Sequence, residues 1–257
     1  MSGPFRLVQL TDSHIGAGWS DLDPAAGLRQ VVAAIRRVAD RPDAILITGD
    51  LVEHGDPAEY AVVRELASGL GAPVLALPGN HDDRDTLRRC FGLGGTAGEP
   101  VQYSVDLGPV RLVALDTTRP GQDDGELSPD RLRWLDAELA LAPDQTTLLA
   151  MHHPPFAIGI PVWDAIGLPA DDRRALADVV RRHPQVRRML AGHVHQPMIG
   201  AVAGRAAITV PSTYMQARLD CSGTGLEFGD APPGFALHTE TDGEIVSHVL
   251  AVDPIDD

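Results

Sequence analysis

The stretch "VRRMLAGHVHQP" (residues 186–197) joins an apolar run to a glycine and two histidines. A short run of this kind, ending at Ala191, is typical of a buried strand, and His193 and His195 follow directly after Gly192. Taken alone, the stretch leaves two interpretations open, because two histidines after a strand can face solvent as well as bind a metal. The rest of the chain decides between them.

Four other apolar runs also end in side chains that can bind metal ions. They are "VQLTDSH" (8–14), "ILITGD" (45–50), "LALPGNHD" (75–82) and "LLAMHHPP" (148–155). In open α/β sheets, functional sites form where loops meet at the carboxyl ends of the strands. Each motif alone is also typical of an ordinary turn, but the five together contain six of the ten histidines. Their common position after a strand favours one shared site over coincidence.

Apolar runs rich in Val, Ile and Leu alternate with helical patterns, which predicts an α/β chain. We expect strands at 5–10, 44–48, 74–78, 102–107, 110–116, 146–151 and 186–191. We expect helices at 24–39, 57–70, 84–90, 129–141 and 170–182. From about residue 198 the chain is β-rich, with strands at 206–210, 234–240 and 244–252 and a hairpin turn at Asp242-Gly243. With no internal repeat and no linker, residues 1–257 are expected to form a single domain.

The composition excludes several classes of protein. A chain of 257 residues that is 44% hydrophobic can build a full core, so disorder is not expected. Its net charge of −15 argues against binding of a nucleic acid duplex, and any phosphate chemistry needs cations at the site. Two cysteines, Cys90 and Cys221, are too few for a disulfide scaffold. The N-terminal "MSGPFRLVQLTD" does not resemble a signal peptide and no apolar segment has transmembrane length, so we expect a cytoplasmic protein without a membrane partner.

The spacing within the motifs suits shared metal ligation. In an extended chain residues i and i+2 point the same way, so Asp12 with His14, and His193 with His195, can each direct two ligands to one region. A glycine before three of the candidates permits a sharp turn and close approach of the backbone to an ion. The candidate ligands are Asp12, His14, Asp50, Asn80, His152, His193 and His195. Seven nitrogen and oxygen ligands suit two ions that share a carboxylate, with Mn, Fe, Zn or Co as the candidate metals. Two ions about 4 Å apart clamp the attacking and leaving oxygens of a phosphoryl transfer.

In this order, "DSH", "GD", "GNHD", "HHPP" and "GHVH" resemble the motifs of the calcineurin-like metallophosphoesterase family. The whole chain is most similar to its bacterial class III cyclic nucleotide phosphodiesterase and glycerophosphodiesterase branch. The motifs extend from Asp12 to His195, and "PPGFALHTE" and "EIVSHVL" are similar to the end of that branch. The resemblance implies a four-layer α-β-β-α sandwich with two mixed β-sheets. It also implies a cofactor of two divalent or mixed-valence transition-metal ions.

The resemblance further implies a role for each candidate. Asp12, His14 and His195 would hold one ion, Asn80, His152 and His193 the other, and Asp50 would bridge both. His81 would face the scissile phosphate and stabilise charge or protonate the leaving oxygen, while Asp82 supports the cluster from outside. Asp50 and His81 are thus the expected catalytic residues, and water activated by the ions attacks phosphorus in line. The expected substrate contacts are Asn80, His81, His153, His195, Phe156 and Trp163.

The segment "PFAIGIPVWDAIGLPA" (155–170) shows no clear helical stripe. Its large side chains, among them Phe156 and Trp163, either pack the loop against the body of the protein or form one wall of a substrate pocket. Met215 is a candidate for the opposite wall. Among the histidines outside the motifs, His183 is expected at a solvated helix end and His238 in a structural position.

These features predict a dinuclear-metal-dependent phosphodiesterase that acts on small substrates, with 3′,5′-cyclic AMP as a candidate. A phosphomonoesterase or glycerophosphodiesterase of broad specificity is the alternative with the same metal chemistry. A non-catalytic metal-binding scaffold is a third possibility, but such proteins usually lose ligands and all seven are present here. Relatives of this kind are often dimers or larger homo-oligomers, and sequence does not fix the oligomeric state.

Overall fold

Two β-sheets form the centre of the computed structural model, which describes residues 3–38, 41–222 and 225–252. The first sheet contains β1 (Phe5–Leu10), β2 (Ala44–Thr48), β3 (Val74–Leu77), β12 (Gly234–Thr241) and β13 (Glu244–Ala251), in the order β13-β12-β1-β2-β3. β1, β2 and β3 are parallel, whereas β12 and β13 run antiparallel to their neighbours. This sheet is therefore mixed.

The second sheet is also mixed. It contains β4 (Tyr103–Asp106), β5 (Arg111–Ala114), β6 (Thr147–Ala150), β7 (Val186–Ala191), β8 (Met198–Val202) and β9 (Arg205–Thr209), in the order β4-β5-β6-β7-β9-β8. Its four central strands are parallel and its two edge strands antiparallel. A separate ribbon pairs β10 (Gln216–Ala217) with β11 (Phe228–Gly229).

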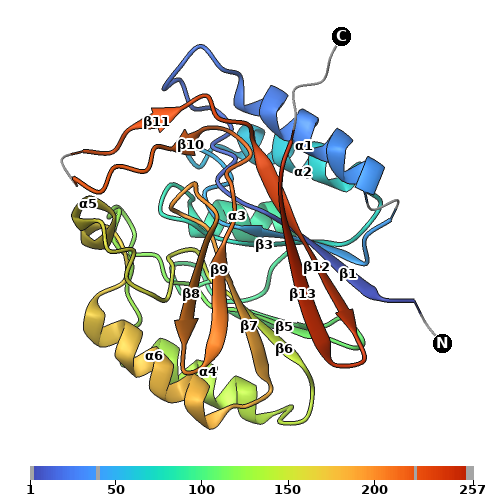
Figure 1. The fold of residues 1–257 in the computed structure, drawn as a ribbon, viewed down its shortest axis with the longest axis vertical. Helices are drawn as coiled ribbons and strands as arrows, with labels where there is room; N and C mark the ends of the chain where they lie inside the picture. Colours follow the sequence, from blue (N-terminus) through green and yellow to red (C-terminus); the bar gives the residue numbers. More distant parts are fainter. Residues whose placement is uncertain (1–2, 39–40, 223–224, 253–257) are drawn as a thin grey trace.

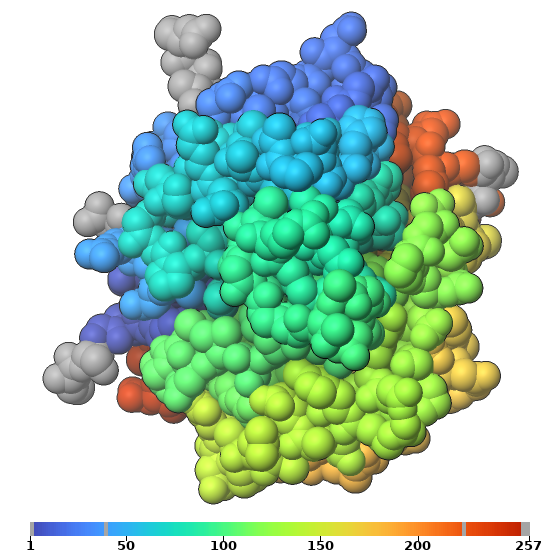
Figure 2. Space-filling view, turned by 180° about the vertical axis from the view of Figure 1, so that it is seen from behind, coloured from blue at the N-terminus to red at the C-terminus, as the bar shows by residue number. Residues whose placement is uncertain are grey.

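Two groups of helices cover the outer faces of the two sheets (Figure 1). The first group comprises α1 (Pro24–Val38), α2 (Pro57–Ser68) and α3 (Arg84–Phe91), and the second comprises α4 (Pro129–Ala140) and α6 (Ala170–Arg182). The short α5 (Pro161–Ala165) packs instead near Val194, Ala217 and Phe228. Seen from behind, the early part of the chain (blue to cyan) lies above the later part (green to yellow), with α3 and its following loop between them (Figure 2).

Three buried clusters show how the layers stack. Val8 packs outward against the first helix group, and Val113 packs outward against α4 and α6. Leu7, one residue before Val8, points the opposite way and meets Leu112 and Leu190 of the second sheet. This alternation follows from the two-residue period of a strand, which gives each sheet two apolar faces when both are covered. The layers are thus helix, sheet, sheet, helix, and the four-layer expectation is confirmed.

The helix and hairpin signals of the sequence have direct counterparts. Ser128 caps α4 by accepting a hydrogen bond from the Arg131 amide, with Pro129 in the first turn. Asp242 and Gly243 both have positive φ, 51° and 85°, as the tight turn between β12 and β13 requires. α4 therefore begins, and β12 and β13 meet, where the sequence predicts.

The expected helix end at Ala39 lies outside the described residues. Three other expectations differ from the structure. β8 was not expected, because Gly200 weakens its strand pattern, yet the missing side chain leaves room for the Phe156 ring. The segment 155–170 contains the short helix α5. His183 is buried at the end of α6 and bonded to Asp136 at 2.7 Å, so it is not solvated.

Within the described residues no helix combines the length and apolar character needed to cross a bilayer.

Candidate dinuclear metal centre

The carboxyl ends of strands from both sheets converge on one buried region. β1 leads into Asp12 and His14, β2 into Asp50, and β3 into Asn80. From the second sheet, β6 leads into His152, and β7 leads into His193 and His195. The two sheets thus supply ligands to the same place from opposite sides.

Backbone strain is concentrated at the same positions. Among the described residues, positive φ values in residues other than glycine occur at Asp12 (52°), His14 (42°), Asp50 (49°), Ala203 (49°), Asp242 (51°), His193 (72°) and His195 (48°). Five of these seven are candidate ligands. A side chain in this left-handed region costs free energy, and such strain persists where the surrounding structure holds it for a functional arrangement. The strain therefore marks the strand ends as a built site.

Two glycines make room for the ligands. A Cβ on Gly79 would lie 2.1 Å from Asp50 Oδ1, and one on Gly49 would lie 2.3 Å from His152 Nδ1. Gly49 also has φ of +93°, which a larger residue adopts only with strain. The requirement for glycine at these two positions follows from the close approach of neighbouring ligand segments.

The ligand atoms converge closely. His14 Nε2 lies 3.1 Å from His195 Nε2 and 3.6 Å from Asp50 Oδ2, which is itself 3.4 Å from His152 Nε2. Asn80 Oδ1 lies 3.0 Å from His152 Nε2 and 3.2 Å from His193 Nδ1. Two groups within which candidate ligand atoms lie within 4.8 Å of one another are Asp12–His14–His195 and Asp12–Asp50–His152.

Hydrogen bonds on the outer side of the imidazoles orient them toward this centre. His152 Nδ1 donates to the Thr48 carbonyl at 2.8 Å, and His195 Nδ1 donates to the Met215 carbonyl at 2.7 Å. His14 Nδ1 faces the Glu53 carboxylate at 3.1 Å. With Nδ1 carrying the proton, each Nε2 presents its lone pair inward, which is how protein imidazoles are prepared for metal ions.

Some candidate ligand atoms do not satisfy one another by hydrogen bonds, and metal ions would satisfy them. The facing Nε2 atoms of His14 and His195 are two acceptors with no proton between them when both are neutral. Burial raises the pKa of Asp12 to about 7, with a further contribution from the charge of Asp50. Two divalent cations would remove these conflicts, and the nitrogen and oxygen donors without thiolate suit Mn, Fe, Zn or Co.

His81 lies beside the ligands and remains partly open to solvent. Its amide donates to Asp50 Oδ1 at 3.0 Å, and its Nδ1 lies 3.3 Å from Glu53 Oε2. Burial lowers its pKa, but the hydrogen bond with Glu53 and the charge of Asp50 outweigh burial and raise it to about 9. In the metal-free site His81 is thus a cation and a proton donor at neutral pH.

Asp82 supports the turn that carries Asn80 and His81. Its Oδ2 accepts from the amides of Gly79 (2.9 Å) and Leu51 (3.2 Å), and its Oδ1 accepts from the Tyr60 hydroxyl (3.0 Å). These bonds fix the turn against the segment that carries Asp50.

Two expected substrate contacts lie elsewhere. His153 is fully buried behind the site, with Nδ1 at 2.8 Å from Thr117 Oγ1 and Nε2 at 3.1 Å from the Asp123 carbonyl. Phe156 packs over Gly200 in the core of the second sheet. Neither residue lines the cleft in front of the ligands, because the chain after His152 turns inward before it returns to the surface as α5.

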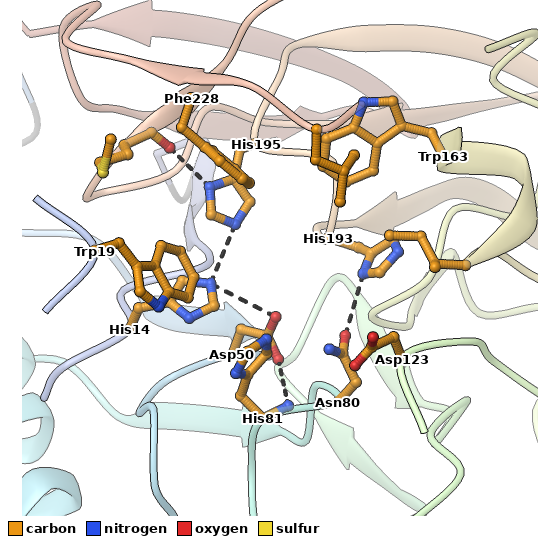
Figure 3. Close-up of a pocket in the computed structure, with 13 residues that line it drawn as sticks. His14, Trp19, Asp50, Asn80, His81, Asp123, Trp163, His193, His195 and Phe228 are labelled. Carbon is orange, nitrogen blue, oxygen red and sulfur yellow. Dashed lines mark hydrogen bonds and ion pairs between the residues drawn. The ribbon is translucent and has the colours of Figure 1, made fainter. Parts of the chain in front are cut away.

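A cleft of about 430 Å³ opens in front of the ligands. Figure 3 shows Trp19 and His14 on one side, Trp163, His193 and Asp123 on the other, and Asp50 between them. The remaining lining residues are Asn80, His81, Ile166, His195, Met215, Leu226 and Phe228. Four of the expected substrate contacts (Asn80, His81, Trp163 and His195) and the Met215 wall therefore border this cleft.

Sequence reasoning missed several residues around the cleft. Trp19 donates from Nε1 to Glu53 Oε1 at 3.2 Å, and its ring lies 5.7 Å from that of Phe228. Asp123 and Leu226 were also missed. Only Trp19 carried a usable signal, since an aromatic residue five positions after His14 lies in the loop leaving the first strand.

Known proteins similar to this chain identify its family. A family model described as calcineurin-like phosphoesterase matches residues 5–197. A protein of Synechococcus sp. named "Probable cyclic nucleotide phosphodiesterase" is 37% identical, covering 96% of this chain and 92% of that protein. The glycerophosphodiester phosphodiesterase GpdQ of Enterobacter lignolyticus is 30% identical, covering 94% of this chain and 89% of that one.

A dimetal phosphatase from Danio rerio has a similar solved structure, with a TM-score of 0.66 at 18% identity, covering 98% of this chain and all of that one. That likeness supports the fold alone. The family match and the identity to full-length relatives settle the classification, and with it the expectation of a hydrolase. The chain belongs to the calcineurin-like phosphoesterase family.

Proposed function

We propose that this protein is a dinuclear-metal-dependent phosphodiesterase that hydrolyses small phosphodiesters. The observation that carries the proposal is the convergence of seven buried or nearly buried donors, five of them on strained backbone, at the base of one open cleft. Asp12, His14 and His195 would hold one ion, Asn80, His152 and His193 the other, and Asp50 would lie between them. When bound, the two ions supply charge for the phosphate and lower the pKa of water.

The protein's own residues supply orientation and a proton. Asp50 holds the His81 amide, and Glu53 holds the His81 ring, so His81 is directed toward the phosphate position above the ligands. A protonated His81 stabilises the negative charge that develops on the phosphoryl oxygens and donates a proton to the leaving alkoxide. Because the described residues lining the cleft include no arginine, His81 is their single cationic side chain.

The walls of the cleft favour an organic ester group with a flat apolar part. Trp19 and Phe228 lie 5.7 Å apart, and Trp163 lies 6.4 Å from Phe228. Met215, Leu226 and Ile166 extend this apolar surface. Bases stack on such aromatic side chains with about 1–3 kcal/mol each, so a cyclic nucleotide such as 3′,5′-cyclic AMP is the leading candidate, in line with the name of the Synechococcus relative.

A glycerophosphodiester is the second candidate. The name of the Enterobacter relative supports it, and the metal chemistry would be the same. A small polyol would leave the aromatic wall unused, so the two candidates differ in their dependence on Phe228.

Activity after metal reconstitution tests the proposal. Apo protein loaded with Mn, Fe, Zn or Co is assayed on bis-p-nitrophenyl phosphate, p-nitrophenyl phosphate, 3′,5′-cyclic AMP and glycerophosphocholine. We expect diester hydrolysis that depends on metal. Protein that binds two ions and hydrolyses no diester would contradict the proposal and indicate a scaffold.

Phe228→Ala separates the two substrates. Removing the ring should raise KM for 3′,5′-cyclic AMP about tenfold, the lower half of the stacking range, and leave KM for glycerophosphocholine unchanged. Leu219→Ala is the control, because Leu219 is 70% exposed, belongs to the same part of the chain and does not line the cleft. Equal effects on both substrates would reject the nucleobase assignment.

A further inference from the structure

Asp123 is the residue of the cleft that the proposed reaction does not use. It lies in the loop between β5 and α4, and Figure 3 shows its carboxylate on the side of Asn80 and His193. It lines the cleft together with these two candidate ligands. Asp123 is therefore a second carboxylate, besides Asp50, in the wall of the cleft.

The loop that carries Asp123 is held in place. His153 binds both of its sides, through Nδ1 to Thr117 Oγ1 at 2.8 Å and through Nε2 to the Asp123 carbonyl at 3.1 Å. The Gly125 amide donates to the Gly167 carbonyl at 3.2 Å, and a Cβ on Gly125 would lie 2.8 Å from the His153 ring. The buried His153 thus holds the loop against the site.

The charge of Asp123 is uncompensated by the protein. Its carboxylate has no hydrogen-bond or ion-pair partner in the described part of the chain, whereas the neighbouring Asp124 pairs with Arg119 at 2.5 Å. Arg119 also lies 3.8 Å from Glu126 and does not line the cleft. Unlike Asp50, Asp123 is not among the residues whose ligand atoms gather at the metal centre.

A negative charge at this position distinguishes phosphate esters by their own charge. A phosphodiester carries one negative charge, while a phosphomonoester carries nearly two above its second pKa of about 6. We infer that Asp123 is a specificity-determining residue that disfavours phosphomonoesters, both as substrates and as the product of diester hydrolysis. It thereby favours diesters and accelerates release of the dianionic product. The inference rests on the proposed phosphodiesterase function.

The test compares Asp123→Asn with Asp124→Asn in metal-loaded protein. Both variants remove one negative charge from adjacent positions, but only Asp123 lines the cleft. For Asp123→Asn we expect the ratio of kcat/KM on p-nitrophenyl phosphate to that on bis-p-nitrophenyl phosphate to rise about three- to tenfold, the effect of one like-charge pair across a partly hydrated cleft. The dissociation constant of phenyl phosphate, measured by calorimetry, should fall by a similar factor. Asp124→Asn should leave both quantities near the wild-type values.

Ionic strength gives a readout that needs no variant. Raising salt from 0.05 M to 0.5 M screens exposed charges. The ratio of kcat/KM on the diester to that on the monoester should therefore fall in the wild type and change less in Asp123→Asn. An unchanged substrate ratio and unchanged phenyl phosphate affinity in Asp123→Asn would overturn the inference, as would equal effects of Asp124→Asn. Wild-type protein that hydrolyses no diester would instead reject the proposed function.

Discussion

Two buried carboxylates, Asp116 and Asp50, have opposite surroundings. Asp116 follows β5 and is paired with Arg84 Nε at 2.8 Å, and it also accepts from the amides of Val101 (2.8 Å) and Thr118 (2.7 Å). Asp50 follows β2 and faces imidazoles, with no arginine beside it. Buried charges are stable when they are paired or bound to metal. The fold pairs Asp116 with an arginine, whereas it surrounds Asp50 with imidazoles that are themselves candidate metal ligands.

Asp50→Ala gives the largest expected effect. Loss of the carboxylate between the two ions should remove at least one ion and lower kcat/KM on bis-p-nitrophenyl phosphate by at least about 1,000-fold, since ion-based charge stabilisation amounts to several kcal/mol. Metal analysis and diester kinetics measure both. A variant that keeps two ions and full activity would show that Asp50 is a structural residue like Asp116.

Asp116→Ala should lower the stability of the protein and leave its metal binding unchanged. Removing this partner leaves the buried Arg84 unpaired, which costs about 3–5 kcal/mol of the free energy of unfolding. Urea unfolding measures the loss, and metal content per folded chain should stay at the wild-type value. Loss of metal from folded Asp116→Ala protein would erase the distinction between the two carboxylates.

His81→Ala separates catalysis from ligation. Metal content should remain near normal, because the ligand side chains are untouched, while kcat falls about 100-fold through loss of the proton donor. Metal loss in this variant would refute the assigned role and place His81 among the ligands.

Among the histidines, His238 is the structural counterpart of the site residues. Its replacement gives the smallest expected effect, a change in how the free energy of unfolding depends on pH. It is buried in β12, with Nδ1 at 2.8 Å from Ser247 Oγ and Nε2 at 3.1 Å from Gln9 Oε1, so both nitrogens are satisfied, whereas His193 Nε2 has no partner among the described residues. Burial, with the charge of Arg188, lowers its pKa to about 3. The unfolded chain, with a histidine pKa of about 6.5, therefore takes up a proton that the folded state resists, and stability is lost as pH falls below 6.5.

The measurement uses chelator-treated wild type and His238→Gln in urea at pH 7 and pH 5. Between these pH values wild type should lose about 2 kcal/mol more free energy of unfolding than the variant. Equal losses would mean that His238 titrates in the folded protein as it does in the unfolded chain.

The sequence predicts the strand ends because they depend on local signals, whereas the sandwich was implied by the resemblance to the family. Runs such as 44–48 and 186–191 are short and apolar, as buried strands are. The motif residues follow directly after these runs. β8 was not predicted, because Gly200 disfavours a strand in the sequence pattern. The reason for a glycine there is the Phe156 ring, which fills the space that a side chain would occupy, and only the structure shows this contact. His153 and Asp123 could not be placed either, since their roles depend on a contact between segments about thirty residues apart.

Anomalous scattering from manganese-soaked crystals would locate the metal ions themselves. We expect two peaks about 3.5–4 Å apart, with Asp50 in contact with both ions, Asp12, His14 and His195 around one, and Asn80, His152 and His193 around the other. A single peak, no peak, or ions held by other side chains would contradict this expectation.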